Sequence, residues 1–443
     1  MNEESSQETL RNKAEKIFRY ALSSVDAKKL LKEKITVKNS ILNVDNFFEI
    51  ELDKFNKIIV LGSGKASVPM AYAIEDILKD RISYGLVVTK YGYGSRLSKL
   101  EVVEAGHPVP DKKGVEATEK IIEILKKCGK DDLVIYLLSG GTSALLCAPE
   151  DKISLKDKQK ITELLLNSGA NIKEINTVRK HLSKVKGGKL GRYAHPARVI
   201  NLILSDTIGD DISITGSGPF VYDKTGSSDV EFILKKYNIF DKLSDYMKKF
   251  IEERKGETVK PESKALNNCK HYVIGNNTIA LENAGIKAEE YGFNSMILTS
   301  LMEGEAREVA KITAGIAKEI LFYNRPVKKP ACVLCGGETT VTIRGSGKGG
   351  RCQEFALVSA LEISGLKNVV VLCGGTDGTD GPTDAAGAIV DSFTVERGLK
   401  KGLVAEKHLK NNDSYNFFSR TGELIFTGPT NTNIMDIVII LVS

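Results

Sequence analysis

Short apolar runs alternate with helical stretches along most of the chain, and this rhythm predicts a parallel sheet flanked by helices. Charged and apolar positions at helical spacing predict that residues 7–31 start the chain as an amphipathic helix. The first strand is expected at 57–61, followed by a helix at 68–78. Further strands are expected at 85–89, 99–103, 133–138 and 198–204, with helices at 115–126 and, as a pair, between 155 and 184.

A second series of strands and helices follows a helical region at 224–254 and a polar, proline-containing stretch at 255–264 that is typical of a linker. We expect its strands at 271–274, 331–335, 369–373 and 437–442, and a long helix at 303–323. Because 443 residues exceed the size of a single core, we predict two domains, 1–255 and 256–443, with the active site in the cleft between them. The expected fold class is α/β: a doubly wound, mostly parallel Rossmann-like sheet plus a second α/β domain.

The composition is that of an ordinary globular protein. Charged residues make up 27% and hydrophobic residues 42% of the chain, and no apolar run reaches the roughly 20 residues of a membrane span. The acidic, polar N-terminus is unlike a secretory signal, so we expect a cytoplasmic protein, and seven cysteines without a repeated spacing predict free thiols. The net charge of +6 is spread along the chain and tryptophan is absent, so neither nucleic acid nor a membrane is an expected partner. The expected assembly is a monomer or a homodimer.

Three of the apolar runs end in a glycine pair followed by polar residues. The segments that follow them are Ser139-Gly140-Gly141-Thr142-Ser143, Gly336-Gly337-Glu338-Thr339 and Gly374-Gly375-Thr376-Asp377. In an α/β fold such loops bring backbone amides, hydroxyls and carboxylates to the carboxyl edge of a sheet, where ligands bind. The sequence therefore predicts an enzyme for a small anionic substrate.

The segment 62–67, Gly-Ser-Gly-Lys-Ala-Ser, comes close to two nucleotide-binding motifs and completes neither. A P-loop requires glycine where Ile59 stands. A dinucleotide fingerprint requires glycine or alanine in place of Ser67, and an acidic residue where the next strand ends at Lys90. What remains is a helix N-terminus with exposed amides and a lysine, which is a general anion site.

Ser63, Gly64 and Lys65 are the candidate binding residues of this turn, although a merely solvated lysine is an equally simple interpretation. His107 has a pKa suited to acid–base chemistry, or it only shapes the loop between its glycine and proline neighbours.

A basic helix supplies further candidates. Lys180 and Lys184 lie four residues apart, a repulsive pairing on an isolated helix that becomes useful when phosphate oxygens sit between the charges. Arg179 precedes them, and Gly187 and Gly188 follow the helix. The alternative is a solvated basic face.

Acidic residues cluster after two of the expected strands. Asp206 follows the strand at 198–204, where it can hold a hard cation or accept a proton. The segment 374–387 carries Asp377, Asp380 and Asp384 among glycines and hydroxyls, a composition that suits Mg²⁺ bridging phosphates but lacks the spacing of an EF-hand loop. We take Asp206, Asp377 and Asp380 as candidate metal ligands.

Eight motifs in a fixed order resemble one known family. They are Gly-Ser-Gly-Lys-Ala at 62–66, Glu-Ala-Gly-His-Pro-Val-Pro-Asp at 104–111, Leu-Ser-Gly-Gly-Thr-Ser-Ala-Leu-Leu at 138–146, Val-Arg-Lys-His-Leu-Ser at 178–183, Leu-Ser-Asp at 204–206, Gly-Gly-Glu-Thr-Thr-Val at 336–341, Gly-Gly-Arg-Cys-Gln-Glu at 349–354, and the segment 374–387. This set is similar to the type II glycerate kinases, also called glycerate 2-kinases, with a MOFRL module here at about 330–436.

The resemblance implies transfer of the γ-phosphoryl group of ATP to the 2-hydroxyl of D-glycerate, giving 2-phosphoglycerate, with Mg²⁺. It matches Lys65 and Arg351 to transition-state cations and Asp206 to the carboxylate near the substrate hydroxyl. By the same resemblance the loop at 140–143 and the basic segment 179–189 hold phosphates, and the loop that contains Thr430 and Asn431 is a further ligand loop.

Two other functions are weighed against this one. An NAD(P)-dependent hydroxypyruvate reductase would need the dinucleotide fingerprint that is incomplete here. A non-catalytic phosphosugar-binding protein could use the turn at 62–67 alone, but it would not need the acidic loop and the cations of the second half.

Overall fold

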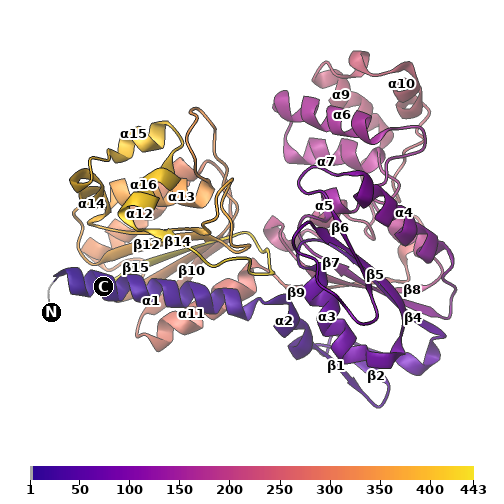
Figure 1. Ribbon diagram of the computed structural model, residues 1–443, viewed down its shortest axis with the longest axis horizontal. Helices are drawn as coiled ribbons and strands as arrows, with labels where there is room; N and C mark the ends of the chain where they lie inside the picture. The colour runs from indigo at the N-terminus through magenta and orange to yellow at the C-terminus, as the bar shows by residue number, and fades with distance from the viewer. Residues whose placement is uncertain (1–2) are drawn as a thin grey trace. The chain divides into compact units, whose positions relative to one another are not determined.

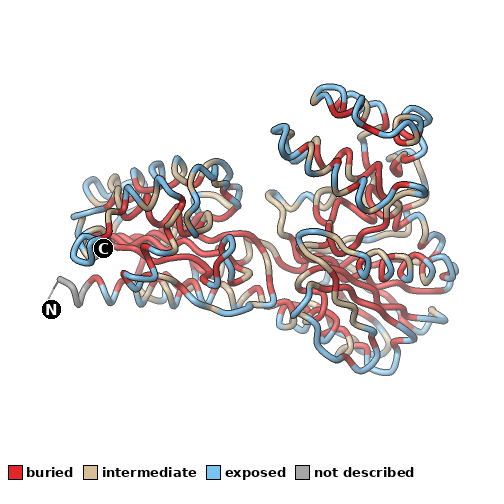
Figure 2. The backbone as a smooth tube through the Cα atoms, turned by 45° about the horizontal axis from the view of Figure 1, so that its top comes forward, coloured by how far each residue is buried: buried red, intermediate tan, exposed pale blue. Residues whose placement is uncertain are grey.

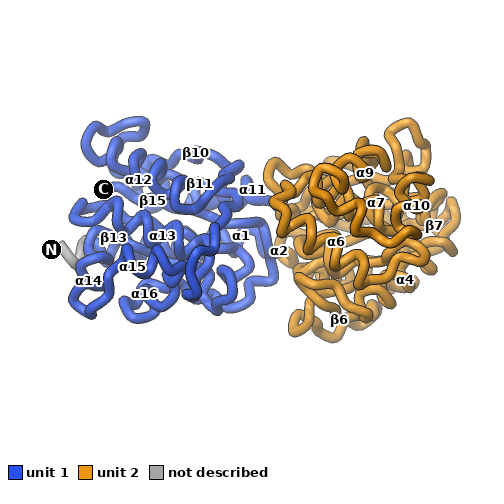
Figure 3. Tube along the Cα trace, turned by 90° about the horizontal axis from the view of Figure 1, so that it is seen from above, with its two compact units in different colours: residues 1–26, 275–443 blue, residues 27–274 orange. Residues whose placement is uncertain are grey.

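The computed structural model describes residues 3–443, with side chains from residue 7 onward. The chain forms two compact units: unit 1 is Met1–Asp26 together with Gly275–Ser443, and unit 2 is Ala27–Ile274 (Figure 3). The expected boundary lay between residues 255 and 256, with the N-terminal helix in the first domain. The observed division differs at both points, because the first helix packs on strands from the C-terminal part of the chain.

Unit 2 is built on a six-stranded sheet. Its strands are β4 (Lys57–Ser63), β5 (Ile82–Lys90), β6 (Glu101–Ala105), β7 (Asp132–Leu138), β8 (Arg198–Leu204) and β9 (Cys269–Gly275). They lie in the order β6-β5-β4-β7-β8-β9, and the neighbours from β6 to β8 are parallel (Figure 1). Counted along the chain this is the Rossmann order 3-2-1-4-5-6, in which the winding reverses between β4 and β7. The predicted doubly wound sheet is confirmed.

Helices and a small sheet complete unit 2. Those that contact the main sheet are α3 (Ser67–Leu78), α4 (Lys112–Lys126), α5 (Thr142–Leu145) and α8 (Lys189–Ala194), whereas α2 (Ala27–Lys34) packs on α3 and β1. A separate lobe consists of α6 (Leu155–Asn167), α7 (Ile172–His181), α9 (Ser227–Lys236) and α10 (Asp245–Glu252), which share a hydrophobic core of their own. An antiparallel sheet joins β1 (Ile35–Lys38), β2 (Ile41–Val44) and β3 (Phe48–Glu51).

Unit 1 contains a six-stranded mixed sheet. Its strands are β10 (Asn294–Met302), β11 (Ala331–Gly337), β12 (Val369–Gly375), β13 (Gly387–Asp391), β14 (Leu424–Ile425) and β15 (Asp436–Val442), in the order β10-β11-β15-β12-β13-β14. Within it β10 and β11 run parallel, whereas β15 is antiparallel to both of its neighbours. Its helices are α1 (Glu3–Ser24), α11 (Asn277–Glu290), α12 (Ala306–Tyr323), α13 (Arg351–Glu362), α14 (Thr394–Lys400), α15 (Ala405–Lys410) and α16 (Ser414–Thr421).

The helices of unit 1 cover both faces of its sheet. In Figure 1, α1 and α11 lie on one side and α12 to α16 on the other. The central strands β11, β12 and β15 are buried along their whole length, as Figure 2 shows, because helices shield them from both sides. The two α/β domains predicted from the sequence are thus confirmed.

Short 3₁₀ segments connect several of these elements, at Leu52–Lys54, Lys79–Arg81, Ile208–Asp210, Thr215–Ser217, Phe240–Lys242 and Lys264–Leu266. Within residues 3–443, no helix combines the length and the apolar character that crossing a bilayer requires. All seven cysteines are free, as predicted.

Three local expectations are wrong. The helix expected at 7–31 is divided into α1 and α2, which belong to different units. The helical region at 224–254 is likewise two helices, α9 and α10. The strand at 271–274 was expected to open the second series, yet β9 is the edge strand of the unit 2 sheet. The first and third errors concern which unit an element packs in, and hydrophobic periodicity does not contain that information.

Candidate active site

In unit 2, two predicted glycine segments meet where the winding of the sheet reverses. The turn after β4 and the loop after β7 are joined by hydrogen bonds from Lys65 N to Gly140 O (2.8 Å) and from Ser139 N to Ser63 O (3.1 Å). A Cβ atom at Gly64 would lie 2.2 Å from Ser139 Oγ, so the contact requires glycine at this position. The structure therefore brings together the residues that the sequence proposed at both sites.

Buried hydroxyl groups hold this junction. Thr142 Oγ1 donates to the carbonyls of Ser63 (2.7 Å) and Ser139 (2.8 Å), and Ser63 Oγ shares a 2.7 Å hydrogen bond with the hydroxyl of Tyr136. Burial raises the pKa of the Tyr136 phenol, so this group stays protonated. Tyr136 was not a candidate from the sequence, because it lies inside an apolar strand with no signal that sets it apart.

The backbone amides of the β4–α3 turn are not exposed, which corrects the expectation of an anion-binding helix N-terminus there. The amides of residues 64 to 67 donate to Val88 O, Gly140 O, Ser139 Oγ and Gly64 O. By contrast, the amides of Gly140, Gly141 and Ser143 make no hydrogen bond to any residue between 3 and 443. The backbone donors that remain for an anion are thus in the loop after β7.

His107 and Lys65 approach the same loop. A Cβ atom built on Gly141 would lie 3.1 Å from His107 Nε2 and 3.3 Å from Lys65 Cγ, and Gly141 has a φ of 85° that favours glycine. Both side chains are half-buried. An ammonium group and an imidazole therefore lie beside the amides that face no protein acceptor.

Asp206 lies two residues beyond the end of β8 and is half-buried. Because β7 and β8 are parallel neighbours, their carboxyl ends share one edge of the sheet. The loop that follows Asp206 reaches the glycine loop, where Ser217 Oγ and Ser143 Oγ share a 2.9 Å hydrogen bond. The carboxylate is consequently on the same edge as Lys65.

The predicted basic segment is only partly available to a ligand. Lys180 Nζ pairs with Asp223 (3.2 Å), and Lys184 Nζ pairs with Glu119 (3.1 Å) and Asp151 (2.9 Å). Burial opposes the charge of Asp223, but Lys180 outweighs it and lowers the pKa of that carboxyl. Both lysines therefore have carboxylate partners where the sequence predicted phosphate.

Gly187 and Gly188 pack against neighbouring segments of unit 2, and their amides are not available to a ligand. Their amides donate to the carbonyls of Ser217 (3.0 Å) and Gly218 (2.8 Å). A Cβ atom at Gly187 would meet Thr258 at 2.6 Å, so close packing explains this glycine without a ligand. Two residues of the predicted basic segment do contact the glycine loop: Arg179 Nη2 lies 3.4 Å from Ser143 O, and Lys186 Nζ donates to the same carbonyl at 3.0 Å.

In unit 1, Asp436 lies where the ends of three neighbouring strands are side by side. It is the first residue of β15 and lies opposite the last residues of two antiparallel neighbours, Gly337 of β11 and Gly375 of β12. Its side chain is 1% exposed. Sequence reasoning missed Asp436, although an acidic residue directly before the apolar run 437–442 was a usable signal.

Asp436 holds the predicted catalytic arginine. Arg351 Nε and Nη2 donate to its two carboxylate oxygens at 2.6 and 2.9 Å, and Arg351 Nη1 lies 2.6 Å from Glu338 Oε1. Burial lowers the pKa of the guanidinium, but the two carboxylates outweigh this effect and raise the pKa above its usual value. Arg351 is therefore a permanent cation held in a bidentate geometry at the start of α13.

Asp380 caps a helix, and its role as a metal ligand stays a prediction. It is 3% exposed, and its two oxygens accept the amides of Cys352 (3.1 Å) and Gln353 (2.8 Å) in the first turn of α13. Gly350, at the N-cap of α13, has no side chain that could do this. Burial, opposed by these bonds, raises the pKa of Asp380 to about 7.

The other unit 1 candidates lie on loops around the same strand ends. Asp377 is half-buried, and its Oδ1 accepts the amide of Thr379 at 3.2 Å. Thr430 Oγ1 donates to Thr376 O at 2.5 Å, Asn431 is exposed, and Thr339 is buried. No group of three His, Cys, Asp or Glu side chains forms a metal site in the described part of the chain.

Asn277, the first residue of α11, also contacts these strand ends. Its Nδ2 donates to the carbonyls of Ile434 (2.9 Å) and Asp436 (3.0 Å). A Cβ atom at Gly336 would lie 1.7 Å from Asn277 Oδ1, so the glycine pair that ends β11 leaves room for this side chain.

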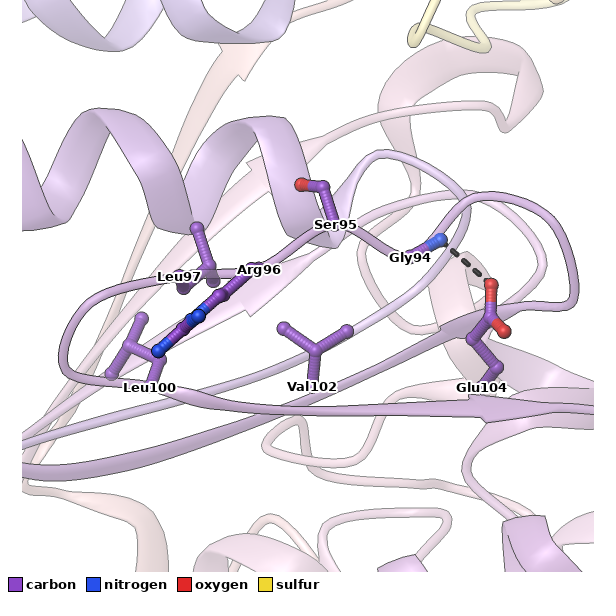
Figure 4. A pocket seen from close by; sticks show the side chains of 7 residues that line it. All are labelled: Gly94, Ser95, Arg96, Leu97, Leu100, Val102 and Glu104. Carbon is purple, nitrogen blue, oxygen red and sulfur yellow. Dashed lines mark hydrogen bonds between the residues drawn. The ribbon is translucent and has the colours of Figure 1, made fainter.

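Unit 2 also has a polar pocket of about 430 Å³ along the loop after β5 and the edge strand β6 (Figure 4). Glu104 closes one end and accepts the amides of Gly92 (2.8 Å) and Gly94 (2.9 Å). The other lining residues are Ser95, Arg96, Leu97, Leu100 and Val102. None of them belongs to the predicted site.

Comparisons with known proteins show which family this chain belongs to. Residues 13–252 match the family model described as a domain of unknown function, DUF4147, and residues 331–436 match the MOFRL family. The chain is 43% identical to a D-glycerate 2-kinase of Thermotoga maritima over 92% of its own length and 96% of that protein. It is 44% identical to a glycerate 2-kinase of Pyrococcus horikoshii, over 89% of each chain. The crystal structure of a glycerate kinase from Thermotoga maritima superposes with a TM-score of 0.87 at 40% identity, covering 98% of this chain and all of that one.

Proposed function

Since the chain belongs to the glycerate kinase family that carries a MOFRL module, we propose that it transfers the γ-phosphoryl group of ATP to the 2-hydroxyl of D-glycerate and releases 2-phosphoglycerate. Kinases of this kind act mainly by positioning reactants and by neutralising charge around the transferring group. The residues of both units are suited to these two tasks.

The observation that carries the proposal is the fixed guanidinium of Arg351. Asp436 and Glu338 occupy three of its nitrogen atoms, so its orientation is set before a ligand binds. A delocalised cation fixed in this way stabilises negative charge that develops on phosphoryl oxygens. Since a third of the side chain is exposed, the group is accessible from solvent.

In unit 2 the corresponding parts are Lys65, the amides of Gly140, Gly141 and Ser143, and the carboxylate of Asp206. Backbone amides and an ammonium group hold phosphate oxygens. Asp206, half-buried at the strand edge, is suited to orient the substrate hydroxyl and to accept its proton.

Mg²⁺ is suited to the predicted carboxylate ligands of each unit. Asp206 is half-buried at the strand edge of unit 2, and Asp377 is half-buried on a loop of unit 1. Magnesium in such sites takes one or two carboxylates together with phosphate oxygens, so a cluster of three acids is unnecessary. The ion would neutralise charge between the phosphates.

The sheet order alone would also suit a dinucleotide-dependent reductase, but the first turn does not. In a Rossmann enzyme the amides of that turn hold the pyrophosphate. Here the amides of residues 64–67 donate to protein atoms, and β5 ends in Lys90 rather than in an acidic residue. Nothing in the structure favours reduction of hydroxypyruvate over phosphorylation of glycerate.

The test is a paired assay on one preparation. With D-glycerate and Mg-ATP we expect formation of ADP, dependence on the divalent metal, and a product that enolase dehydrates directly because it is the 2-phosphate. With hydroxypyruvate and NADH we expect no loss of the reduced cofactor. Oxidation of NADH without formation of ADP would replace the proposal by the reductase alternative, and 3-phosphoglycerate as the sole product would refute the regiochemistry.

A further inference from the structure

Three basic side chains of unit 2 gather behind the glycine loop. Lys158 lies on α6, Arg179 in the last turn of α7, and Lys186 in the turn before α8. Lys186 Nζ donates to Ser143 O at 3.0 Å and to Gly216 O at 3.5 Å, and Arg179 Nη2 lies 3.4 Å from the same Ser143 carbonyl. Two of the three cations thus converge on one residue of the loop.

The third side chain, Lys158, has no acceptor. Its residue is 5% exposed, and Nζ is buried without a hydrogen-bond partner anywhere in the described chain. An ammonium group has three N–H donors, so this is an uncommon situation for a buried lysine. Burying a charged group without a partner is costly, and proteins tolerate it mainly where a ligand completes the site.

Neighbouring lysines of the same region form ion pairs with carboxylates, unlike Lys158, Arg179 and Lys186. Lys180 pairs with Asp223, and Lys189 pairs with Glu150 at 2.6 Å while also donating to two carbonyls. No carboxylate of residues 3–443 forms an ion pair with Lys158, Arg179 or Lys186. Burial, reinforced by their mutual repulsion, lowers the pKa of both Lys158 and Lys186.

We propose that Lys158, Arg179 and Lys186 form a binding site for an oxyanion of the substrates, contiguous with the amides of the glycine loop. This inference rests on the proposed function for the identity of the ligands. Arg179 is half-buried and is the accessible member, whereas the two lysines lie deeper. The arrangement selects a small planar or tetrahedral oxyanion, which either the carboxylate of glycerate or a phosphate of the nucleotide can supply.

Direct binding measurements test the site without requiring turnover. Calorimetric titration of the full chain with D-glycerate, with ADP and with inorganic phosphate is compared between wild type and Lys158→Met, which keeps the volume of the side chain and removes its charge. We expect the Kd of one substrate to rise tenfold or more. A change confined to D-glycerate assigns the carboxylate to the site, and a change confined to ADP assigns a nucleotide phosphate.

The thermal stability of the ligand-free protein provides a second readout. Lys158→Met should raise the melting temperature, because it removes a buried charge without breaking an ion pair. The control is Arg307→Met in unit 1, which leaves the buried carboxylate of Glu354 without its ion pair. It should lower the melting temperature and leave every Kd within about twofold of the wild-type value, since Arg307 is outside the proposed site.

Unchanged Kd values in both Lys158→Met and Lys186→Met would overturn the site. One specific alternative is that the cations serve the Cys147 thiol, which lies beside all three. In that case the variants would slow alkylation of Cys147 and leave ligand binding intact. If wild type binds neither D-glycerate nor ADP, the proposed function fails. In that case, phosphate binding that is lost in Lys158→Met would still support the oxyanion site. Absence of phosphate binding to the wild type would refute the oxyanion site.

Discussion

The two groups of strand ends in this molecule are held together by different chemistry. In unit 2, neutral hydroxyls and backbone groups fix the junction of β4 and β7, and the buried ammonium group of Lys158 has no hydrogen-bond partner in the described chain. In unit 1, an ion pair fixes Arg351, and carboxylates surround it. Unit 2 therefore suits a negatively charged ligand, whereas unit 1 presents one cation of fixed orientation together with acidic groups.

The largest effect is expected from Arg351→Lys, which keeps the positive charge and loses the planar guanidinium that makes the bidentate contact. We expect kcat to fall a hundred- to a thousandfold, the cost of removing a fixed stabiliser of developing charge. Steady-state kinetics and circular dichroism on the same preparation provide the measurement.

The matched control for that substitution is Arg397→Lys. Arg397 is 34% exposed against 33% for Arg351, and it also contacts two buried carboxylates, Asp391 and Glu423. Its replacement should lower the melting temperature and leave kcat near the wild-type value. Equal losses of kcat in both variants would mean that Arg351 only supports the fold of unit 1.

The next effect concerns the stability of unit 2 at low pH. Burial lowers the pKa of His271 to about 4, so the folded state keeps this imidazole neutral while the unfolded chain binds a proton below about pH 6.5. The free energy of unfolding should therefore fall as the pH drops from 6.5 towards 4, by about 3 kcal/mol in total. Urea titrations of wild type and His271→Leu at several pH values should diverge over this window, and parallel pH profiles would contradict the assignment.

A smaller effect is expected for Asp436→Asn, which preserves the shape of the carboxylate and removes its charge. Arg351 keeps Glu338 as a partner but loses the bidentate contact, so we expect kcat to fall about tenfold while KM changes little, as for loss of one charge-assisted bond. The comparison is with Asp391→Asn, which removes the charge that faces Arg397. A large rise in KM with unchanged kcat would show that Asp436 acts in binding rather than in orienting the guanidinium.

The smallest effect tests the neutral junction of unit 2. Thr142→Val removes the bonds to the Ser63 and Ser139 carbonyls, and it should cost about 1–3 kcal/mol of stability. KM for the phosphate donor should rise a few-fold because the glycine loop loses its anchor. Thr118→Val breaks comparable buried bonds to Gly114 O and Cys147 N, and it should destabilise to a similar degree without any change in KM.

The fold class, most of the strands and the glycine loops could be predicted from the sequence, because these depend on periodicity and on local backbone freedom. The sequence also located Lys65, Asp206 and Arg351 at strand ends or helix starts, where the structure places them. These features are properties of short segments, and short segments carry their own signals.

Which charges are paired could not be predicted from the sequence, because the partners meet only in the folded chain. Lys180 and Lys184 looked like phosphate ligands, but partners 43 and 65 residues away neutralise them. Lys158 was not a candidate from the sequence, yet it is buried and its Nζ has no hydrogen-bond partner in the described chain. The same holds for Asp436, which three converging strands bring to Arg351 across 85 positions of the chain. The energy of a charge depends on what surrounds it in space, and only the folded chain specifies those surroundings.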